Sequence, residues 1–462
     1  MVYCIYLRLD HRRQNRFLLI ASLAFYAAWN WKFLFWIFLT TLVDYRVALE
    51  LSESEVPARR KRLISISVIA NLLTLGFFKY YHFFADNLQA LLNSFGLHAS
   101  LPVLNIVLPL GISFYTFQAM SYTIDVYRRQ VQPVRNFYDF AAYVTFFPQL
   151  AAGPIERAPH LMPQFLSPRV VTFEKFYEGC YLIFWGLFQK IVLADNLAKI
   201  VNPVFEAAGP YSGGQVLLAT YAFAFQIFCD FSGYSDMARG LAKLMGFDIM
   251  INFNLPYFAT YPGDFWKRWH ISLSSWLRDY LYIPLGGNKN GTLLTFRNLF
   301  FVMLLGGLWH GAAWHFILWG AYHGLLFILY QCIDRAGWKR PAFFSGKRAQ
   351  VWSFFKGFFF FHLVCLGWLF FRAKSAGQIG EMLNALFFHL DLRAVWQSPG
   401  FTPMALLIAL LLAVQVLQYR KKNPLAVFGL PTVVRWGFYV LLFHLMAAFG
   451  MGTAAQFIYF QF

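Results

Sequence analysis

Three histidines and three tryptophans stand close together in the stretch GGLWHGAAWHFILWGAYHG, which runs from Gly306 to Gly324 in otherwise apolar sequence. An imidazole ring can take up and return a proton near pH 7, which suits it to general acid–base chemistry. A polar ring inside a membrane is costly, so its presence there favours a functional role. His310 is the first candidate, because glycines flank it on both sides.

The apolar sequence around His310 is too long for one membrane helix. From Thr292 to Tyr330 it would form a helix nearly 60 Å long, about twice the thickness of the hydrocarbon core. We therefore expect a break at Gly306, Gly307 or Gly311. A break inside lipid is tolerated only beside protein or a water-filled cavity, so we expect His310 to face a polar cavity about midway through the bilayer.

The other two histidines of this stretch are separated from His310 by the helix geometry. On a continuous helix, His310 and His323 would lie more than about 140° apart around the axis and about 20 Å apart along it. The three rings could then not share one metal ion, and we expect no metal site. For His315 and His323 we favour a structural role, in which each ring donates a hydrogen bond to a neighbouring helix.

A second group of candidates lies in DFWKRWHISLSSWLRDYLYIPLGGN, from Asp264 to Asn288. Its tryptophans and leucines recur with helical spacing, and charged residues occupy the other side, which predicts an amphipathic helix at the membrane interface. His270 lies at the edge of the apolar stripe, where its ring could point beneath the protein. The alternative is that the whole helix only anchors the chain to lipid headgroups.

Two further motifs combine polar residues with apolar runs. In FFPQLAAGPIERA (Phe146 to Ala158), prolines and a Gly-Pro pair interrupt an apolar run, which predicts a span that ends in a re-entrant loop. In QIFCDFSGYSDMARG (Gln226 to Gly240), buried carboxylates would be costly unless paired. We expect Asp230 or Asp236 to pair with Arg239 or another basic group.

The composition defines the setting of these motifs. The 462 residues are 59% hydrophobic and only 13% charged, with a mean hydropathy of +0.50, whereas about a quarter of the residues of a soluble domain are charged. The chain is therefore an all-α polytopic membrane protein. Its apolar stretches predict about ten to twelve spans or re-entrant segments.

The basic residues indicate a topology and not a nucleic-acid partner. The net charge is +18, but lysines and arginines occur in short clusters between apolar runs, as in cytoplasmic loops and lipid-headgroup contacts. We expect the clusters at 58–62, 339–348 and 419–423 to lie on the cytoplasmic side. A further basic cluster at 10–16 and the cluster at 58–62 bracket the stretch from Phe17 to Leu49. If both lie inside, this stretch must cross twice, as a hairpin that turns near Trp29 to Lys32.

Taken together, in this order and spacing, the four quoted motifs resemble the membrane-bound O-acyltransferase (MBOAT) family, specifically its bacterial alginate O-acetyltransferase branch. The resemblance covers about Phe17 to Tyr330. It implies one MBOAT domain over residues 1–462, in which helices and re-entrant and interfacial segments surround a central funnel. Residues 17–330 would form the catalytic core and 331–462 the C-terminal helices, and 1–16 would be the remainder of a longer N-terminal helix.

The resemblance also implies roles for particular residues. The family's invariant histidine corresponds to His310, which would be the general base, and its second polar position corresponds to His270, which would orient the acyl carbonyl or the donor. No metal or organic cofactor is implied. Further candidates for the tunnel of donor and acceptor are Trp309, Asp264, Arg268, Arg278, Asp279 and His323.

The implied reaction moves an acetyl group from a cytoplasmic thioester, acetyl-CoA or an acyl-carrier protein, to a hydroxyl outside the cytoplasm. The acceptor would be an exopolysaccharide or a partner protein such as a secreted SGNH-type acetyltransferase, and the location would be the bacterial cytoplasmic (inner) membrane. Two alternatives stay open. One is D-alanyl transfer toward teichoic acid from a carrier-protein thioester, and the other is a transporter with a histidine proton relay.

Overall fold

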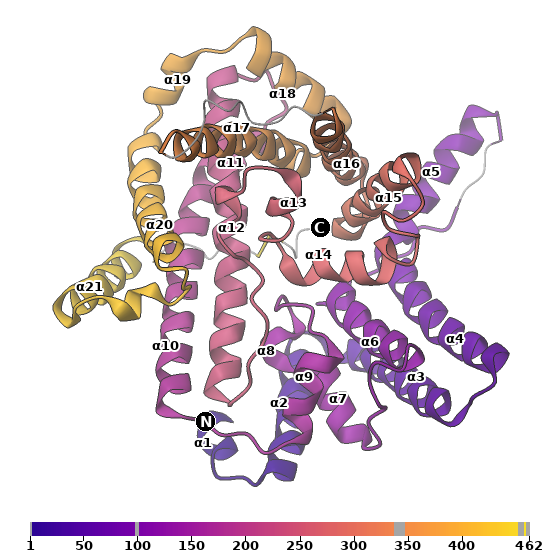
Figure 1. Cartoon of the computed structure of the whole chain (residues 1–462). Coiled ribbons are helices and arrows are strands. Elements are labelled where there is room, and N and C mark those ends of the chain that lie inside the picture. Colours follow the sequence, from indigo (N-terminus) through magenta and orange to yellow (C-terminus); the bar gives the residue numbers. More distant parts are fainter. Residues whose placement is uncertain (1, 98–100, 337–346, 451–456, 459–462) are drawn as a thin grey trace. The chain divides into compact units, whose positions relative to one another are not determined.

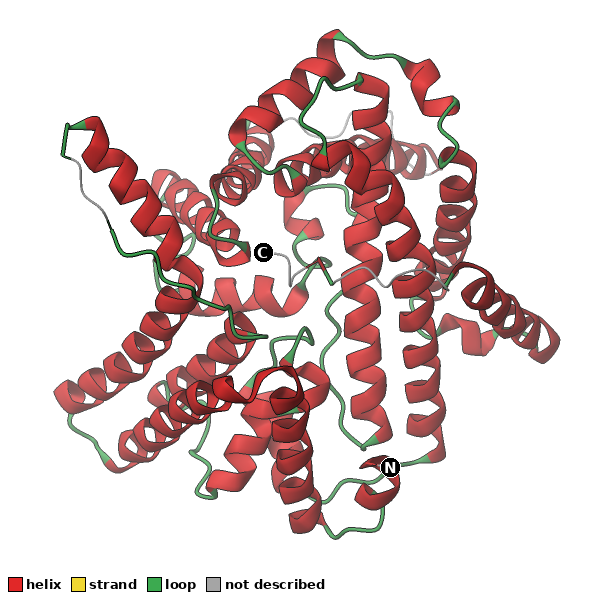
Figure 2. Ribbon diagram, turned by 180° about the vertical axis from the view of Figure 1, so that it is seen from behind, coloured by secondary structure: helices red, strands yellow, loops and turns green. Residues whose placement is uncertain are grey.

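A computed structural model of the chain describes residues 2–97, 101–336, 347–450 and 457–458. Helices and loops account for all of these residues, without a strand among them (Figure 2). Within these ranges, seven helical segments are long and apolar enough to cross a membrane. They are Pro57–Ser94, Gly213–Leu244, Thr292–His310, Trp314–Arg335, Val351–Arg372, Phe401–Lys421 and Thr432–Phe449. The predicted all-helical, multi-pass membrane fold is confirmed, and the remaining apolar stretches form shorter or more polar helices.

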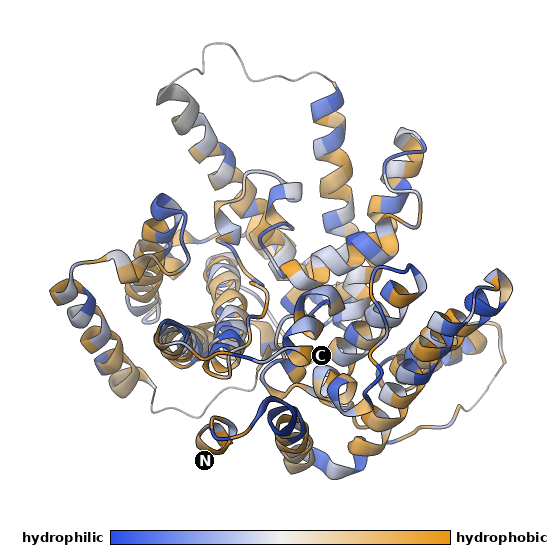
Figure 3. Cartoon of the chain, turned by 60° about the horizontal axis from the view of Figure 1, so that its bottom comes forward, coloured by the Kyte–Doolittle hydropathy of each residue, from blue (hydrophilic) through white to orange (hydrophobic). Residues whose placement is uncertain are grey.

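The contacts divide the chain into two compact units, which are described separately below. The first consists of Met1–Ile183 and Met237–Met250, and the second of Phe184–Asp236 and Ile251–Phe462. Apolar residues predominate along the long helices, whereas hydrophilic residues gather in connecting loops and at helix ends (Figure 3). This distribution fits helices whose ends reach the polar interface.

The first unit contains the helices from α1 through most of α10, and the end of α12 (Figure 1). The predicted interruption near Trp29 to Lys32 is confirmed: α2 and α3 meet at the 3₁₀ turn η1, and the Asn30 side chain accepts a hydrogen bond from the backbone of Lys32. Neither helix is among the seven candidate spans, so the double crossing stays a prediction. The elements are α1 (Val2–Tyr6), α2 (His11–Asn30), η1 (Trp31–Phe33), α3 (Leu34–Glu53), α4 (Pro57–Leu75), η2 (Gly76–Tyr80), α5 (Tyr81–Ser94), α6 (Ile112–Tyr127), α7 (Phe137–Thr145), α8 (Phe147–Leu150), α9 (Ala158–Leu166) and α10 (Phe173–Leu187).

The motif expected to form a re-entrant loop does interrupt the helices. The chain leaves α7 at Phe146, makes the single turn α8, and continues without regular structure to α9. Glu156 lies fully buried in this segment. Its carboxylate accepts a hydrogen bond from the backbone N–H of Met250 and lies 2.8 Å from Nδ1 of His160. The hydrogen bond to Glu156 raises the pKa of His160, although partial burial opposes that shift.

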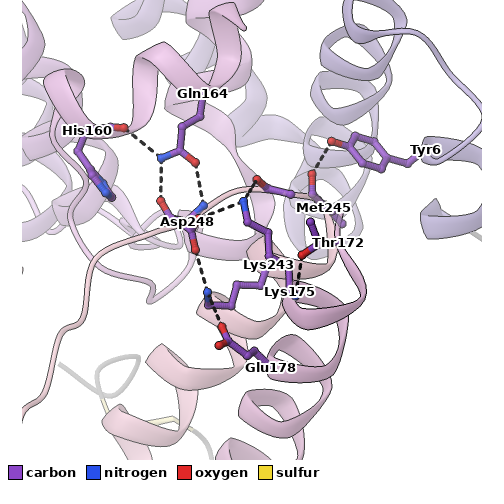
Figure 4. Close-up of polar contacts among 10 residues, drawn as sticks. Tyr6, His160, Gln164, Thr172, Lys175, Glu178, Lys243, Met245 and Asp248 are labelled. Atoms are coloured by element: carbon purple, nitrogen blue, oxygen red, sulfur yellow. Dashed lines mark hydrogen bonds and ion pairs between the residues drawn. The ribbon is translucent and has the colours of Figure 1, made fainter. Parts of the chain in front are cut away.

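A polar cluster holds the segment that follows α12 in the first unit (Figure 4). The side chain of Gln164 donates to the backbone carbonyl of Asp248 and accepts from its N–H, at 2.8 Å each. The Asp248 carboxylate forms ion pairs with Lys175 and Lys243, and Lys243 also pairs with Glu178. Burial alone would raise the pKa of Asp248, but the two lysines outweigh it and hold that pKa below its ordinary value. The cluster thereby joins α9, α10 and the end of α12.

The second unit contains most of the long apolar helices. Besides η4 (Pro256–Phe258), η5 (Arg278–Tyr282) and η6 (Ala426–Gly429), its elements are η3 (Phe188–Ala194), α11 (Asp195–Glu206), most of α12 (Gly213–Leu244), α13 (Pro262–Phe265), α14 (Ile271–Leu277), α15 (Thr292–His310), α16 (Trp314–Arg335), α17 (Lys347–Arg372), α18 (Ala376–Phe388), α19 (Leu392–Trp396), α20 (Phe401–Lys421) and α21 (Thr432–Phe449).

The predicted pairing of Asp230 is confirmed, with Lys190 as its partner. Nζ of Lys190 lies 2.7 Å from the Asp230 carboxylate and 2.8 Å from that of Asp195. The backbone N–H of Ile458 donates to the second carboxylate oxygen of Asp230 at 2.7 Å. Because a buried carboxylate is costly without such partners, Asp230 fixes η3 and residue 458 against the middle of α12.

The predicted topology leads to a labelling experiment. Ala58 to Arg62 form the first turns of α4, and 419–423 end α20, whereas most of 339–348 lies outside the described residues. We expect single cysteines placed at the exposed positions 61–62 and 421–422 to react with a membrane-impermeant maleimide in permeabilised cells but not in intact cells. The background is a variant without the five native cysteines. Labelling of 421–422 from outside would overturn this topology.

Candidate active site

Helices α15 and α16 form a close antiparallel hairpin that carries His310 at its tip. A Cβ atom at Gly307 would lie 2.2 Å from the carbonyl oxygen of Phe316, and one at Gly320 would lie 2.4 Å from that of Met303. Both distances are far below van der Waals contact, so only glycine permits this approach of the two backbones.

The predicted break in the long apolar stretch is confirmed, and of the three candidate glycines it lies at Gly311. The helix continues through Gly306 and Gly307, of which Gly307 permits the close contact with α16, and ends at His310. Gly311 is extended, and α16 begins at Trp314. The separation of His310 and His323 that a continuous helix would impose does not apply, because the chain reverses between them.

Aromatic rings surround His310, and the ring itself is only 4% exposed. Its centroid lies 5.1 Å from that of Trp309, 5.0 Å from that of Trp319 and 5.3 Å from that of Phe371. The immediate neighbours are thus aromatic, where the sequence predicted a polar cavity. The reason is that the reversal at Gly311 folds α16 back onto the end of α15 and brings its aromatic side chains against the histidine.

His270 lies beside His310 within the second unit. The centroids of the two rings are 6.3 Å apart, and that of Trp309 is 5.8 Å from His270. His270 is fully buried. The structure therefore brings together both predicted catalytic histidines and one predicted tunnel residue, although they are 40 positions apart in the sequence.

The segment that carries His270 is not the continuous amphipathic helix that its periodicity predicted. It is divided into α13, a turn, α14 and the π-helical turn η5. His270 itself has φ 43° and ψ 55°, a left-handed conformation that a non-glycine residue rarely adopts. Trp269 and Leu273 of the apolar stripe are buried in protein and do not face lipid.

The left-handed turn allows His270 to cap α14 with its own ring. Nδ1 of His270 accepts a hydrogen bond from the backbone N–H of Leu273 at 3.3 Å. Burial lowers the pKa of His270 to about 3, so the ring is neutral. A neutral imidazole that accepts at Nδ1 carries its proton on Nε2. His270 can therefore donate one hydrogen bond from Nε2 and has no free acceptor to act as a base.

Asn252 holds the His270 turn in place, and sequence reasoning missed it. Its side-chain oxygen accepts hydrogen bonds from the backbone N–H and the hydroxyl of Ser272, at 3.2 and 2.9 Å, while its backbone carbonyl accepts from the N–H of Ile271. Asn252 is 1% exposed. Only the turn composition of its neighbourhood, INFNLP, indicated a polar junction.

His323 belongs to an aromatic cluster next to His310. The ring of Trp319 lies 5.0 Å from both histidine rings and so bridges them. The predicted hydrogen bond from His323 to a neighbouring helix is not seen at Nε2, which is buried against Gly367 and has no hydrogen-bond partner among the described residues. Four indole nitrogens are likewise buried without a hydrogen-bond partner among the described residues, those of Trp266, Trp269, Trp319 and Trp368.

The charged tunnel candidates pair with one another. Nε of Arg268 lies 2.7 Å from the carboxylate of Asp264, and Nε of Arg278 lies 2.7 Å from that of Asp279. The Arg278 pair is largely exposed. No three histidine, cysteine, aspartate or glutamate side chains lie close enough to hold a metal ion in the part of the chain that the structure describes.

The fold and the site together define a class of protein. It is an all-helical, multi-pass membrane protein with two histidines buried beside a helix reversal. Residues 30–371 match the model of the MBOAT, membrane-bound O-acyltransferase, family. The chain belongs to this family, and it is an O-acyltransferase. The resemblance found in the four motifs is thereby confirmed.

Several curated proteins are similar over most of their length. A probable alginate O-acetylase of Pseudomonas putida is 42% identical over 92% of this chain and 84% of its own length. A probable alginate O-acetylase of Pseudomonas aeruginosa is 43% identical over 83% of this chain and 71% of its own length. A peptidoglycan O-acetyltransferase of Helicobacter pylori is 37% identical over 80% and 73%. A teichoic acid D-alanyltransferase of Bacillus subtilis is more distant: it is 28% identical over 59% of this chain and 71% of its own length.

Proposed function

We propose that this enzyme moves an acetyl group from a cytoplasmic thioester across the membrane toward alginate or a similar exopolysaccharide. The observation that carries the proposal is the pair of buried histidines, 6.3 Å apart at a helix reversal, within the region matched by the family model. The similarity to alginate O-acetylases supports this acceptor over teichoic acid, because identity is 42% to the former and 28% to the latter.

In the proposed reaction, His310 acts as the general base. The acceptor hydroxyl attacks the thioester carbonyl carbon while its proton passes to the ring of His310. When the tetrahedral intermediate collapses, the carbon–sulfur bond breaks and the leaving thiolate takes the proton back. Both proton transfers use the same ring, so the enzyme returns to its starting state and the reaction needs no metal or organic cofactor.

His270 is proposed to position and polarise the acyl group. Its proton is placed on Nε2, because Nδ1 accepts the hydrogen bond that caps α14. A neutral donor at the carbonyl oxygen would stabilise the negative charge that develops there during attack. The hydrogen bond from Leu273 to Nδ1 fixes the ring and thereby the direction of this donor. The two histidines thus have different tasks, one accepting a proton and the other donating a hydrogen bond.

The proposed donor is acetyl-CoA or an acyl-carrier protein, attracted by the basic cytoplasmic clusters through long-range electrostatics. Because the acceptor lies outside the cytoplasm, the enzyme is proposed to reside in the bacterial cytoplasmic (inner) membrane. The acetyl group would pass to the glycan directly or through a secreted SGNH-type acetyltransferase.

The test uses the purified full chain in lipid nanodiscs with acetyl-CoA, and measures release of the CoA thiol with and without alginate oligosaccharide. We expect thiol release that depends on the acceptor and produces O-acetylated sugar. Consumption of a D-alanyl carrier protein in place of acetyl-CoA would assign the enzyme to the other branch. In proteoliposomes, acceptor-dependent proton flux without acyl transfer would contradict the proposal and favour a transporter.

A further inference from the structure

A groove between α3 and α4 combines a basic rim with an apolar floor. It has a volume of about 830 Å³ and lies entirely within the first unit. On α3 it is lined by residues 42, 43, 46, 47 and 50, and on α4 by residues 58, 59, 62, 63 and 66. Both sets follow the spacing of a single helix face, so two complete faces of an antiparallel pair form its walls.

The rim carries an excess of positive charge. Arg46, Arg59 and Arg62 line the groove together with one acidic residue, Glu50. Arg59 pairs with Glu50 at 3.6 Å, but both side chains are about half exposed or more, so this pair is weak. Within the described residues, the guanidinium groups of Arg46 and Arg62 have no ion-pair or hydrogen-bond partner. The groove therefore offers two unneutralised cations to an anion.

Buried hydrogen bonds hold the two walls of the groove together. Below it, the Asp44 carboxylate accepts hydrogen bonds from the Asn71 amide, at 2.9 and 3.0 Å, and from the Ser67 hydroxyl. At the loop end, the buried guanidinium of Arg60 donates to the backbone carbonyls of Leu51 and Ser54. The groove is thus built into the helix pair and does not depend on the ligand for its shape.

Exposed apolar side chains extend the groove along α4 away from the basic rim. Ile66, Ile69 and Leu73 are 45%, 55% and 67% exposed and continue the helix face that begins with Arg59 and Arg62. The distance from residue 62 to residue 73 is about 16 Å along a helix, which matches much of one acyl chain. Since α4 begins a candidate membrane span, its basic end lies where lipid headgroups lie.

We propose that this groove binds one anionic glycerophospholipid, with its phosphate on the three arginines and an acyl chain on the apolar stripe. The planar fork of arginine matches the geometry of phosphate, and basic pockets between membrane helices bind acidic headgroups. The apolar floor distinguishes the occupant from free phosphate or CoA, which have no chain to place there. The proposed lipid site does not rest on the proposed acyl-transfer function, although Arg59 and Arg62 also belong to a basic cluster proposed to attract the acyl donor.

The experiment counts lipids bound to the delipidated, detergent-purified full chain by native mass spectrometry. The probes are dioleoyl phosphatidylglycerol and dioleoyl phosphatidylcholine, which share their acyl chains and differ in headgroup charge. We expect one phosphatidylglycerol to bind at least about tenfold more tightly than phosphatidylcholine, in keeping with the attraction that each nearby arginine exerts on an anionic headgroup. Equal binding of the two lipids would overturn the proposal.

Two variants locate the site. The triple variant Arg46→Gln, Arg59→Gln, Arg62→Gln should lose the preference for phosphatidylglycerol, and Ala58→Trp, which fills the groove without changing charge, should lose the bound lipid. The matched control replaces Arg420, Lys421 and Lys422 by Gln and removes the same charge from another exposed cluster.

The control and a competitor separate the alternatives. We expect the 420–422 variant to keep its bound phosphatidylglycerol, and equal loss there would show that only net charge matters. CoA at saturating concentration should leave the lipid bound, and displacement would assign the arginines to the donor. If the triple variant fails to elute as folded protein, the test rests on the other two results. A wild type that prefers phosphatidylglycerol and an Ala58→Trp variant that loses the lipid support the proposal, and the absence of either result overturns it.

Discussion

Replacing His310 by alanine is expected to lower the rate of acetyl transfer by about 10²- to 10⁴-fold, the usual cost of losing a general base. Binding of acetyl-CoA should persist, because the base is needed only when the hydroxyl attacks. The measurement is acceptor-dependent thiol release by the purified variant, together with its affinity for acetyl-CoA. A lower rate at unchanged affinity indicates a chemical defect, whereas a lower affinity indicates a binding defect.

The surroundings of His310 determine which controls are needed. Its ring packs among Trp309, Trp319 and Phe371, so alanine also leaves a cavity. His310→Gln fills more of that space but cannot act as a base, and it should be as inactive as alanine with better stability. His315→Ala, from the same hairpin, should keep most of its activity. If His310→Gln retains activity within about threefold of wild type, His310 is not the base.

Replacing His270 by alanine should impair acetyl transfer by about 10²- to 10³-fold, as does the loss of one hydrogen-bond donor to an oxyanion. His323→Ala should have a much smaller effect. Nε2 of His323 makes no hydrogen bond within the described part of the chain, and the ring reaches His310 only through Trp319. Both variants are compared at equal expression by thiol release and by melting temperature in detergent.

His270 also caps α14, and this structural role requires a separate variant. Asparagine tolerates the left-handed conformation and is a good helix cap, but it lacks the ring nitrogen that would reach the substrate. His270→Asn should therefore recover the melting temperature that His270→Ala loses, without recovering activity. Full recovery of activity in His270→Asn would show that His270 acts only in folding. Equal losses in the alanine variants of His270 and His323 would show that the division between site and packing histidines is wrong.

Much of the fold follows from the sequence, because hydropathy and helical length are local properties. The membrane helices, the turn between α2 and α3, and the need for a break near His310 could be predicted in this way. The partner of Asp230 could be foreseen only as a basic group. Which one it is depends on how the π-helical turn η3 packs against α12, and that is a tertiary contact.

The site was predicted in its residues but not in its geometry. Periodicity assigned the segment around His270 to one helix, because tryptophan and leucine spacing is the same whether or not a left-handed residue interrupts it. The position of the break near His310 was ambiguous for a similar reason. A glycine that ends a helix and one that packs against another helix look alike until the second helix is known. Asn252 was missed because its role exists only through the turn that it holds.

The close approach at Gly307 and Gly320 has a consequence for how tolerant this enzyme is to sequence change. No side chain separates the two backbones there, so the position of His310 is set by main-chain contact. Neighbouring apolar residues can then vary without moving the reactive ring. An added methyl group at either glycine would force the helices apart, displace the ring and abolish turnover. In a saturation mutagenesis screen, these two positions would be as intolerant as the catalytic ones, although neither residue touches a substrate.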